Sequence, residues 1–260
     1  MSDRVYRAAI AAGKLALRAL DLTVRAEGQE HVPASGPVVL ASNHVSFPDF
    51  VFVQRALIGR QRLVRFMCRA DIWDSPFGWA MDAMQHVPVD RQAPAAAYLK
   101  GRRLLEDCQV VCVFPEGGIS AAYVVRAMMP GAVALARATG APLVPVNVWG
   151  SQRLWSQKRS LDAPFPKPDL SRGRLVDVRF QPPIRVAPDA DLVEATRELG
   201  RRLHDGLQAL QQLPEHLPRP GEYAPWHPAH LGGHGIERTA SFQLDGMPRV
   251  SVDPIWGPGT

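Results

Sequence analysis

The stretch that decides the fold reads VVLASNHVSFPDF and covers residues 38 to 50. Its first half is a short continuous apolar run, which is typical of a strand buried on both faces. The segment that follows has the composition of a helix start, with Ser46 as N-cap, Pro48 in the first turn and Asp49 at the capping-box position. The stretch therefore predicts a buried strand that passes directly into a helix.

A histidine, His44, lies at this junction five positions before Asp49. Two interpretations fit the spacing. In the first, Asp49 caps the helix and His44 is an ordinary loop residue. In the second, one helical turn brings the carboxylate to the imidazole, so that Asp49 fixes the tautomer of His44 while His44 removes a proton from an attacking hydroxyl.

The same alternation of strand and helix continues along the chain. The predicted strands are 37–41, 63–67, 110–114, 143–148 and 175–180, and the predicted helices are 47–58, 75–84, 94–107, 128–139 and 190–212. This order predicts an α/β fold with a mostly parallel central sheet flanked by helices. Ligands of such sheets bind at the carboxyl ends of the strands, where His44 lies.

Two terminal segments differ from the predicted domain at 31–213. Residues 1–30 predict an amphipathic helix with a basic polar face and an alanine-rich apolar face, which either packs on its own domain or lies in a membrane interface. In the segment 214–260, 15 of 47 residues are Pro or Gly, which predicts an irregular tail that wraps the surface or is disordered.

The formal charge of +5 indicates an anionic partner such as an acidic lipid surface or a phosphorylated or CoA-linked substrate. The basic residues are scattered and no recognition motif is present, so no nucleic-acid partner is predicted. Three cysteines without paired spacing indicate free thiols in a reducing compartment. Neither a metal nor a cofactor is predicted, because no dinucleotide-binding motif or P-loop is present and the histidines near 227–234 lie among prolines and glycines.

A second polar motif, VFPEGG, follows another apolar run at residues 113 to 118. Its carboxylate, Glu116, and the two glycines Gly117 and Gly118 come at the carboxyl end of a predicted strand. Such a segment is either a polar binding site that a ligand can approach closely or a plain turn.

Together the two strand-end motifs, with VPVDR at 87–91 and PLVPV at 142–146, resemble the glycerolipid acyltransferase family, typified by 1-acyl-glycerol-3-phosphate acyltransferase. The resemblance spans about residues 36 to 150. In that family AsnHis-x4-Asp is the catalytic motif, which falls here on Asn43, His44 and Asp49. The resemblance implies that His44 and Asp49 are catalytic and that Asn43 belongs to the substrate-binding set.

The same resemblance assigns the remaining site residues. It implies that Arg91 helps to hold the glycerol phosphate of the acceptor, and that the segment containing Glu116 binds substrate. The family usually has PheProGluGlyThrArgSer where this chain reads FPEGGIS, so Ile119 stands in place of an arginine that contacts the acceptor phosphate. Arg126 is a candidate replacement for that arginine.

The function implied is transfer of a fatty acyl group from acyl-CoA or acyl-carrier protein to a hydroxyl of lysophosphatidic acid, at the cytoplasmic face of a membrane to which the protein binds peripherally. The lost arginine leaves open another acceptor, such as a glycolipid, another lysophospholipid or a hydroxylated metabolite. A third possibility is a peripheral membrane protein that binds lipid without catalysis. An acceptor panel distinguishes the first two, and liposome binding without any acyl transfer would favour the third.

Overall fold

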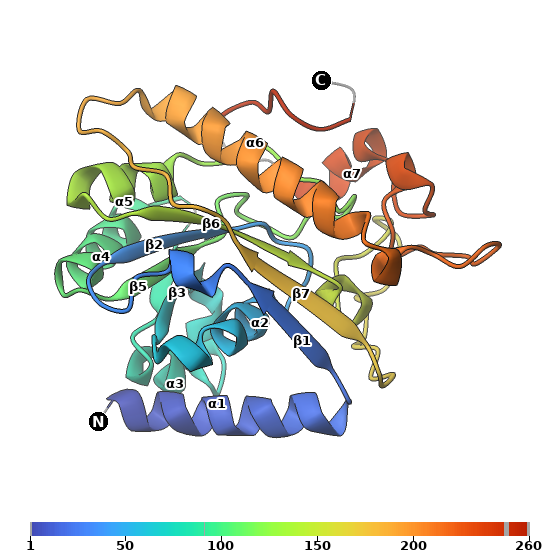
Figure 1. Ribbon diagram of the computed structural model, residues 1–260, viewed down its shortest axis with the longest axis horizontal. Coiled ribbons are helices and arrows are strands. Elements are labelled where there is room, and N and C mark those ends of the chain that lie inside the picture. The colour runs from blue at the N-terminus through green and yellow to red at the C-terminus, as the bar shows by residue number, and fades with distance from the viewer. Residues whose placement is uncertain (1, 91, 247–249, 259–260) are drawn as a thin grey trace.

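A computed structural model describes residues 2–90, 92–246 and 250–258, and these residues form a seven-stranded sheet covered by helices (Figure 1). The strands are β1 (Thr23–Glu27), β2 (Val38–Ser42), β3 (Val64–Arg69), β4 (Val87–Val89), β5 (Val110–Val113), β6 (Leu143–Trp149) and β7 (Leu175–Phe180). They lie in the order β1-β7-β6-β2-β5-β3-β4, and every neighbouring pair is parallel except β6 and β7. The predicted α/β fold with a mostly parallel sheet is confirmed.

Helices cover both faces of the sheet (Figure 1). The helices are α1 (Ser2–Ala19), α2 (Asp49–Ala56), α3 (Gly78–Ala83), α4 (Ala95–Glu106), α5 (Gly131–Thr139), α6 (Leu192–Gln211) and α7 (Arg238–Asp245). Helices α4, α5 and α6 pack on one face, and α1 and α2 pack on the other. The central strand β2 contributes to both cores, because Val39 and Ala41 face the first layer while Val38 and Leu40 face the second. This is why its sequence is continuously apolar rather than alternating.

The N-terminal helix is shorter than predicted. It ends at Ala19, and Asp21 then takes a positive φ of 51°. The chain continues as the unpredicted strand β1, which pairs in parallel with β7. Pairing with a strand far along the sequence therefore overrides the helical pattern that runs on into this segment.

Helix α1 packs on its own domain, which was one of the two predicted arrangements. The Tyr6 hydroxyl donates to the Val64 carbonyl at 2.6 Å, and Leu17 is buried in the apolar cluster that also contains side chains of α2 and of the sheet. No helix among the described residues is long and apolar enough to span a bilayer.

Strand β4 was also not predicted as a strand. It has three residues, and Pro88 at its centre cannot donate a ladder hydrogen bond. The strand is tolerated because it lies at the edge of the sheet, where one side of the backbone needs no partner.

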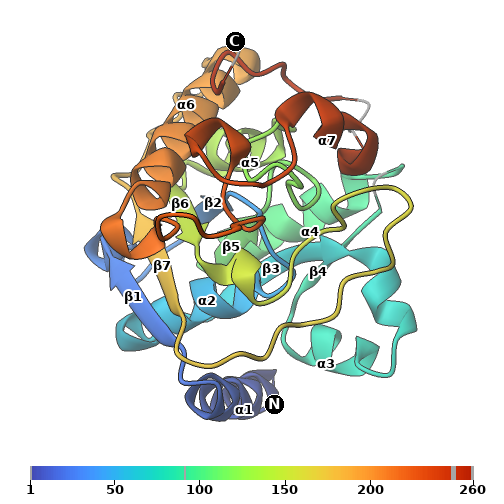
Figure 2. The ribbon, with the colours of Figure 1, turned by 90° about the vertical axis from the view of Figure 1, so that its right-hand side faces the viewer.

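The C-terminal tail wraps the surface and is ordered in its described part (Figure 2). It contains short 3-10 turns and α7, and Val252 forms an isolated antiparallel bridge with Met128. The Trp256 ring is buried against Gly200 of α6, where a Cβ would lie 2.3 Å from the ring. Its apolar side chains thus give the tail enough burial to fold despite its many prolines and glycines.

The three cysteines are free thiols. Cys112 is buried, Cys68 is half-buried and Cys108 is exposed.

Candidate active site

The carboxyl ends of three neighbouring strands meet at one edge of the sheet. Strand β2 is parallel to β6 on one side and to β5 on the other. The residues that follow these ends are His44 after β2, Glu116 after β5 and Ser151 after β6. Three segments that are distant in sequence therefore supply polar groups to one place, as expected for a site in a parallel sheet.

The carboxylate of Asp49 is fully buried and accepts five hydrogen bonds. Its Oδ2 accepts from Nδ1 of His44 at 2.8 Å and from the backbone N–H groups of Val45 and Ser46 at 2.8 and 2.9 Å. Its Oδ1 accepts from the hydroxyls of Ser46 at 2.5 Å and Ser151 at 2.6 Å. Asp49 thus satisfies the turn before α2 and also holds the imidazole in the geometry of the second interpretation, while the proton transfer by His44 stays a prediction.

The predicted N-cap role of Ser46 is wrong. Helix α2 begins at Asp49, and its N-cap is Pro48, which offers no side-chain acceptor. Asp49 therefore reaches back to the free N–H groups of the preceding turn, as the acidic residue of a capping box does. Ser46 instead donates its hydroxyl to that carboxylate.

The imidazole of His44 is held on two sides. Its Nδ1 donates to Asp49, and its ring stacks on Phe114 with 4.2 Å between centroids. The side chain is 18% exposed, and no described residue forms a hydrogen bond with Nε2. With the proton on Nδ1, the lone pair of Nε2 is free to accept a proton from a bound molecule.

Ser151 was not identified from the sequence. It follows Gly150, whose φ of 98° turns the chain sharply after β6 and brings the Ser151 hydroxyl to Asp49. The only signal in the sequence was a GlySer pair after an apolar run, which also fits an ordinary turn.

Glu116 supports the backbone of His44 rather than facing the open side of the site. Its Oε1 accepts from the His44 backbone N–H at 2.9 Å, and its Oε2 accepts from the Arg126 backbone N–H at 3.0 Å. The residue is 1% exposed. Burial raises the pKa of Glu116 to about 7, and the charge of Arg126 opposes this shift. Both carboxylate oxygens are used inside the protein, and the substrate contact predicted for Glu116 stays a prediction.

Asn43 is likewise a structural residue in this arrangement. It is fully buried, its Nδ2 donates to the Val148 carbonyl at 3.1 Å, and its Oδ1 accepts from the Val148 N–H at 2.8 Å. The side chain joins the end of β2 to β6, and its predicted place in the substrate-binding set stays a prediction. Arg91, the predicted phosphate ligand, lies outside the described residues.

The two glycines form the turn after β5. Gly117 has a φ of 66°, a left-handed conformation that favours glycine, and its N–H donates to the Phe114 carbonyl at 3.0 Å. The Gly118 carbonyl accepts from the Arg126 guanidinium at 2.7 Å. That a ligand closely approaches Gly117 and Gly118 stays a prediction.

Arg126 is engaged within the protein and does not offer a free guanidinium. It is buried, and its terminal nitrogens donate to the carbonyls of Glu116, Gly118 and Asp245. Ile119, at the position of the missing arginine, is buried as well. The described residues thus do not place Arg126 as a replacement ligand for an acceptor phosphate.

Comparison with known proteins agrees with this geometry. Residues 23–149, a little under half of the chain, match the acyltransferase family model. The matched segment contains His44, Asp49 and Glu116. The family prediction is therefore confirmed.

Two relatives are chloroplastic 1-acyl-sn-glycerol-3-phosphate acyltransferases. The one from Arabidopsis thaliana is 31% identical over 136 residues, which cover 50% of this chain and 37% of the relative. The one from Brassica napus is 32% identical over 133 residues, which cover 49% of this chain and 38% of the relative. The chain thus matches less than two fifths of the length of these relatives.

A solved structure supports the fold over a longer range. The crystal structure of the 1-acyl-sn-glycerophosphate acyltransferase PlsC from Thermotoga maritima superimposes with a TM-score of 0.64 at 21% sequence identity. The match covers 82% of this chain and 80% of that chain.

Glu116→Gln is expected to change how stability depends on pH. The folded pKa near 7 lies above the ordinary value of 4.5, so between these pH values the folded protein retains a proton that the unfolded chain releases. The contribution of this carboxyl to stability is full below its unfolded pKa and is lost as pH rises through the folded pKa. Urea unfolding should show the wild-type free energy falling relative to the variant by about 2 kcal/mol from about pH 5 to about pH 8.

Other titrating groups cancel in that difference, which is why the two proteins are compared at each pH. His86, for example, has its pKa lowered to about 4 by burial and acts in the opposite direction. A wild-type minus variant difference that stays constant across the pH range would contradict the assignment.

Proposed function

We propose that this protein is an O-acyltransferase that moves an acyl group from a thioester donor to a hydroxyl of lysophosphatidic acid. The observation that carries the proposal is the His44–Asp49 pair, with Nδ1 bound at 2.8 Å and Nε2 free of described partners. The names of the matched relatives support the acceptor class. The donor is acyl-CoA or acyl-carrier protein, and either anionic carrier suits a chain with a formal charge of +5.

In the proposed reaction, Nε2 of His44 takes the proton from the acceptor hydroxyl. The oxygen attacks the thioester carbonyl, a C–O bond forms and the C–S bond breaks, and the leaving thiolate takes the proton back from the imidazolium. Asp49 stabilises that imidazolium through Nδ1. General base catalysis of this kind contributes about 10²–10⁴-fold, and the remainder comes from positioning and stabilisation of the oxyanion.

One observation favours a second candidate acceptor. Ile119 replaces the expected arginine, and Arg126 is buried with its two terminal nitrogens bonded to backbone carbonyls. A hydroxylated lipid without a phosphate at that position needs no such cation. The same catalytic pair then serves a glycolipid or another lysophospholipid.

We also propose that the protein binds peripherally to the cytoplasmic face of a membrane. The segment around α3 exposes Phe77 at 70% and Trp79 at 68%, and α1 beside it exposes Leu15 at 70%. Helices α1 and α3 lie at the same end of the molecule (Figures 1 and 2), and Arg4, Arg7 and Arg18 of α1 are exposed. Exposed aromatic side chains next to a basic helix suit an anionic lipid surface. A non-catalytic lipid-binding protein would share this surface but would not require the His44–Asp49 geometry.

His44→Ala is expected to lower acyl transfer from a long-chain acyl-CoA to lysophosphatidic acid by at least about a hundredfold, because the general base is removed. The measurement is product formation by the purified protein with acyl-CoA and with acyl-carrier protein as donors. His204→Ala, which alters a half-buried histidine on α6, is the matched control and should retain wild-type activity.

The same assay with phosphate-free lysolipids separates the acceptors. Transfer to lysophosphatidic acid that depends on His44 supports the proposed reaction, and transfer confined to phosphate-free acceptors moves the protein to the second candidate. Equal activity in wild type and His44→Ala would refute the mechanism.

Membrane binding is expected to depend on the exposed aromatic pair. Replacing Phe77 and Trp79 together by Ala should weaken binding to phosphatidylglycerol vesicles at least about tenfold, because each ring loses burial worth about 1.5–3 kcal/mol. Vesicle sedimentation measures the partition, and Tyr223→Ala, at a residue 71% exposed in the tail, is the control. Equal partition of the double variant and the wild type would contradict this attachment surface.

A further inference from the structure

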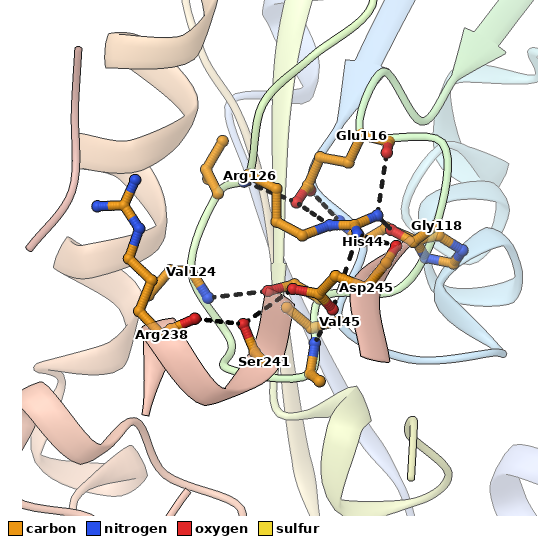
Figure 3. A network of polar contacts seen from close by, with 12 residues as sticks. His44, Val45, Glu116, Gly118, Val124, Arg126, Arg238, Ser241 and Asp245 are labelled. Carbon is orange, nitrogen blue, oxygen red and sulfur yellow. Dashed lines mark hydrogen bonds and ion pairs between the residues drawn. The ribbon is translucent and has the colours of Figure 1, made fainter. Parts of the chain in front are cut away.

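A chain of polar contacts connects the C-terminal tail to the backbone of His44 (Figure 3). It begins at Asp245, the last residue of α7, and passes through Arg126 to Glu116. These three charged groups are buried, and Asp245 lies 119 residues beyond Arg126, whereas Arg126 and Glu116 are 10 residues apart.

Asp245 holds the segment that carries Arg126 in two ways. Its Oδ1 accepts from the Ala121 backbone N–H at 3.0 Å and lies 3.7 Å from Nη1 of Arg126. Its backbone carbonyl accepts from the same Nη1 at 2.5 Å. The other carboxylate oxygen is fixed by the Ser241 hydroxyl at 3.0 Å, so the side chain has one defined orientation.

Arg126 in turn contacts Glu116 and so connects it to Asp245. Its backbone N–H donates to Oε2 at 3.0 Å, its Nε lies 3.7 Å from the same oxygen, and its Nη2 donates to the Glu116 carbonyl at 3.0 Å. Glu116 then accepts the His44 N–H at 2.9 Å. His44 is also held from the same loop, because its carbonyl accepts from the Ser120 N–H at 2.8 Å.

The charged groups of this network are buried, so solvent does not screen them. One buried guanidinium faces two buried carboxylates, Glu116 and Asp245, at 3.7 Å from each. Moving Asp245 would take one of these two carboxylates away from the buried guanidinium and would leave the buried Ala121 N–H without its acceptor, which is unfavourable. The three side chains therefore form a unit in which a change at one end is felt at the other.

We propose that Asp245 is a positioning residue for the active site, which acts through Arg126 and Glu116 to hold the backbone of His44. The inference rests on the proposed function for its catalytic consequence, but not for its structural part. In this proposal the C-terminal tail helps to position the active site, although the tail lies outside the segment that matches the acyltransferase family.

A plain structural role is the alternative, in which Asp245 only fastens α7 to the loop at Ala121. That role predicts lower stability with no specific effect at His44. The positioning role predicts an effect at His44 in protein that remains folded.

The test compares Asp245→Ala and Asp245→Asn with Gln243→Ala, which alters an exposed residue of the same helix without a contact in this chain of residues. Two quantities are measured at a temperature where every variant is folded. The first is the hydrogen-exchange rate of the His44 amide by NMR, relative to the amide of Val144 in β6. The second is kcat and KM for acyl transfer to lysophosphatidic acid.

For Asp245→Ala we expect the His44 amide to exchange about tenfold faster relative to Val144, and kcat to fall about tenfold with KM nearly unchanged, in the range of coupling within one polar network. Asp245→Asn keeps an acceptor for Ala121 and should show a smaller effect, and Gln243→Ala should match the wild type. Unchanged exchange at His44 in folded Asp245→Ala overturns the proposal, whether or not kcat falls. If the wild type transfers no acyl group, the proposed function fails, and the exchange rates still decide the positioning role.

Discussion

The structure of the site depends on the Asp49 carboxylate and the five donors around it. A buried carboxylate is tolerated only when its oxygens are satisfied, and here the donors come from the turn after β2, from His44 and from the loop after β6. If one donor is removed, four hydrogen bonds to Asp49 remain. If the carboxylate is removed, all five donors lose their acceptor. Asp49 thus fixes the start of α2, the imidazole of His44 and the loop at Ser151 together.

The sheet explains why these groups meet. Strands β6, β2 and β5 are adjacent and parallel, so the chain leaves all three at one edge. Asn43 joins β2 to β6 through Val148, and Glu116 joins the loop after β5 to His44. His44 is therefore held by its ring through Asp49 and by its backbone through Glu116. Such double support suits a group that must keep one orientation through a reaction.

The central layer of this fold could be predicted from local patterns. Continuous apolar runs identified the buried strands, because burial on both faces leaves a strong signal in the sequence. The edge strands β1 and β4 could not be predicted this way. β1 is stabilised by pairing with β7, and β4 is three residues long with Pro88 at its centre. Long-range pairing and edge position leave little trace in a local window.

The residues of the site divide in the same way, into those that the local sequence indicates and those that depend on distant segments. The contact between His44 and Asp49 could be predicted because one turn of chain connects them, and the position of Glu116 after a strand was visible in the sequence as well. The direction in which Glu116 and Asn43 point could not be predicted, since it depends on Arg126 and on β6. Ser151 and Asp245 reach the site only through the folding of distant segments, and serine and aspartate are common in ordinary turns and caps.

The most direct test of the account is the effect of Asp49→Asn on acyl transfer and on stability, with Asp205→Asn on α6 as control. An amide cannot accept all five hydrogen bonds, and it cannot stabilise an imidazolium as a carboxylate does. We expect a rate lower by about a hundredfold or more in protein that remains folded, with a loss of about 2 kcal/mol of unfolding free energy. A stability loss of that size with a rate within about threefold of the wild type would contradict it, because Asp49 would then serve the turn alone.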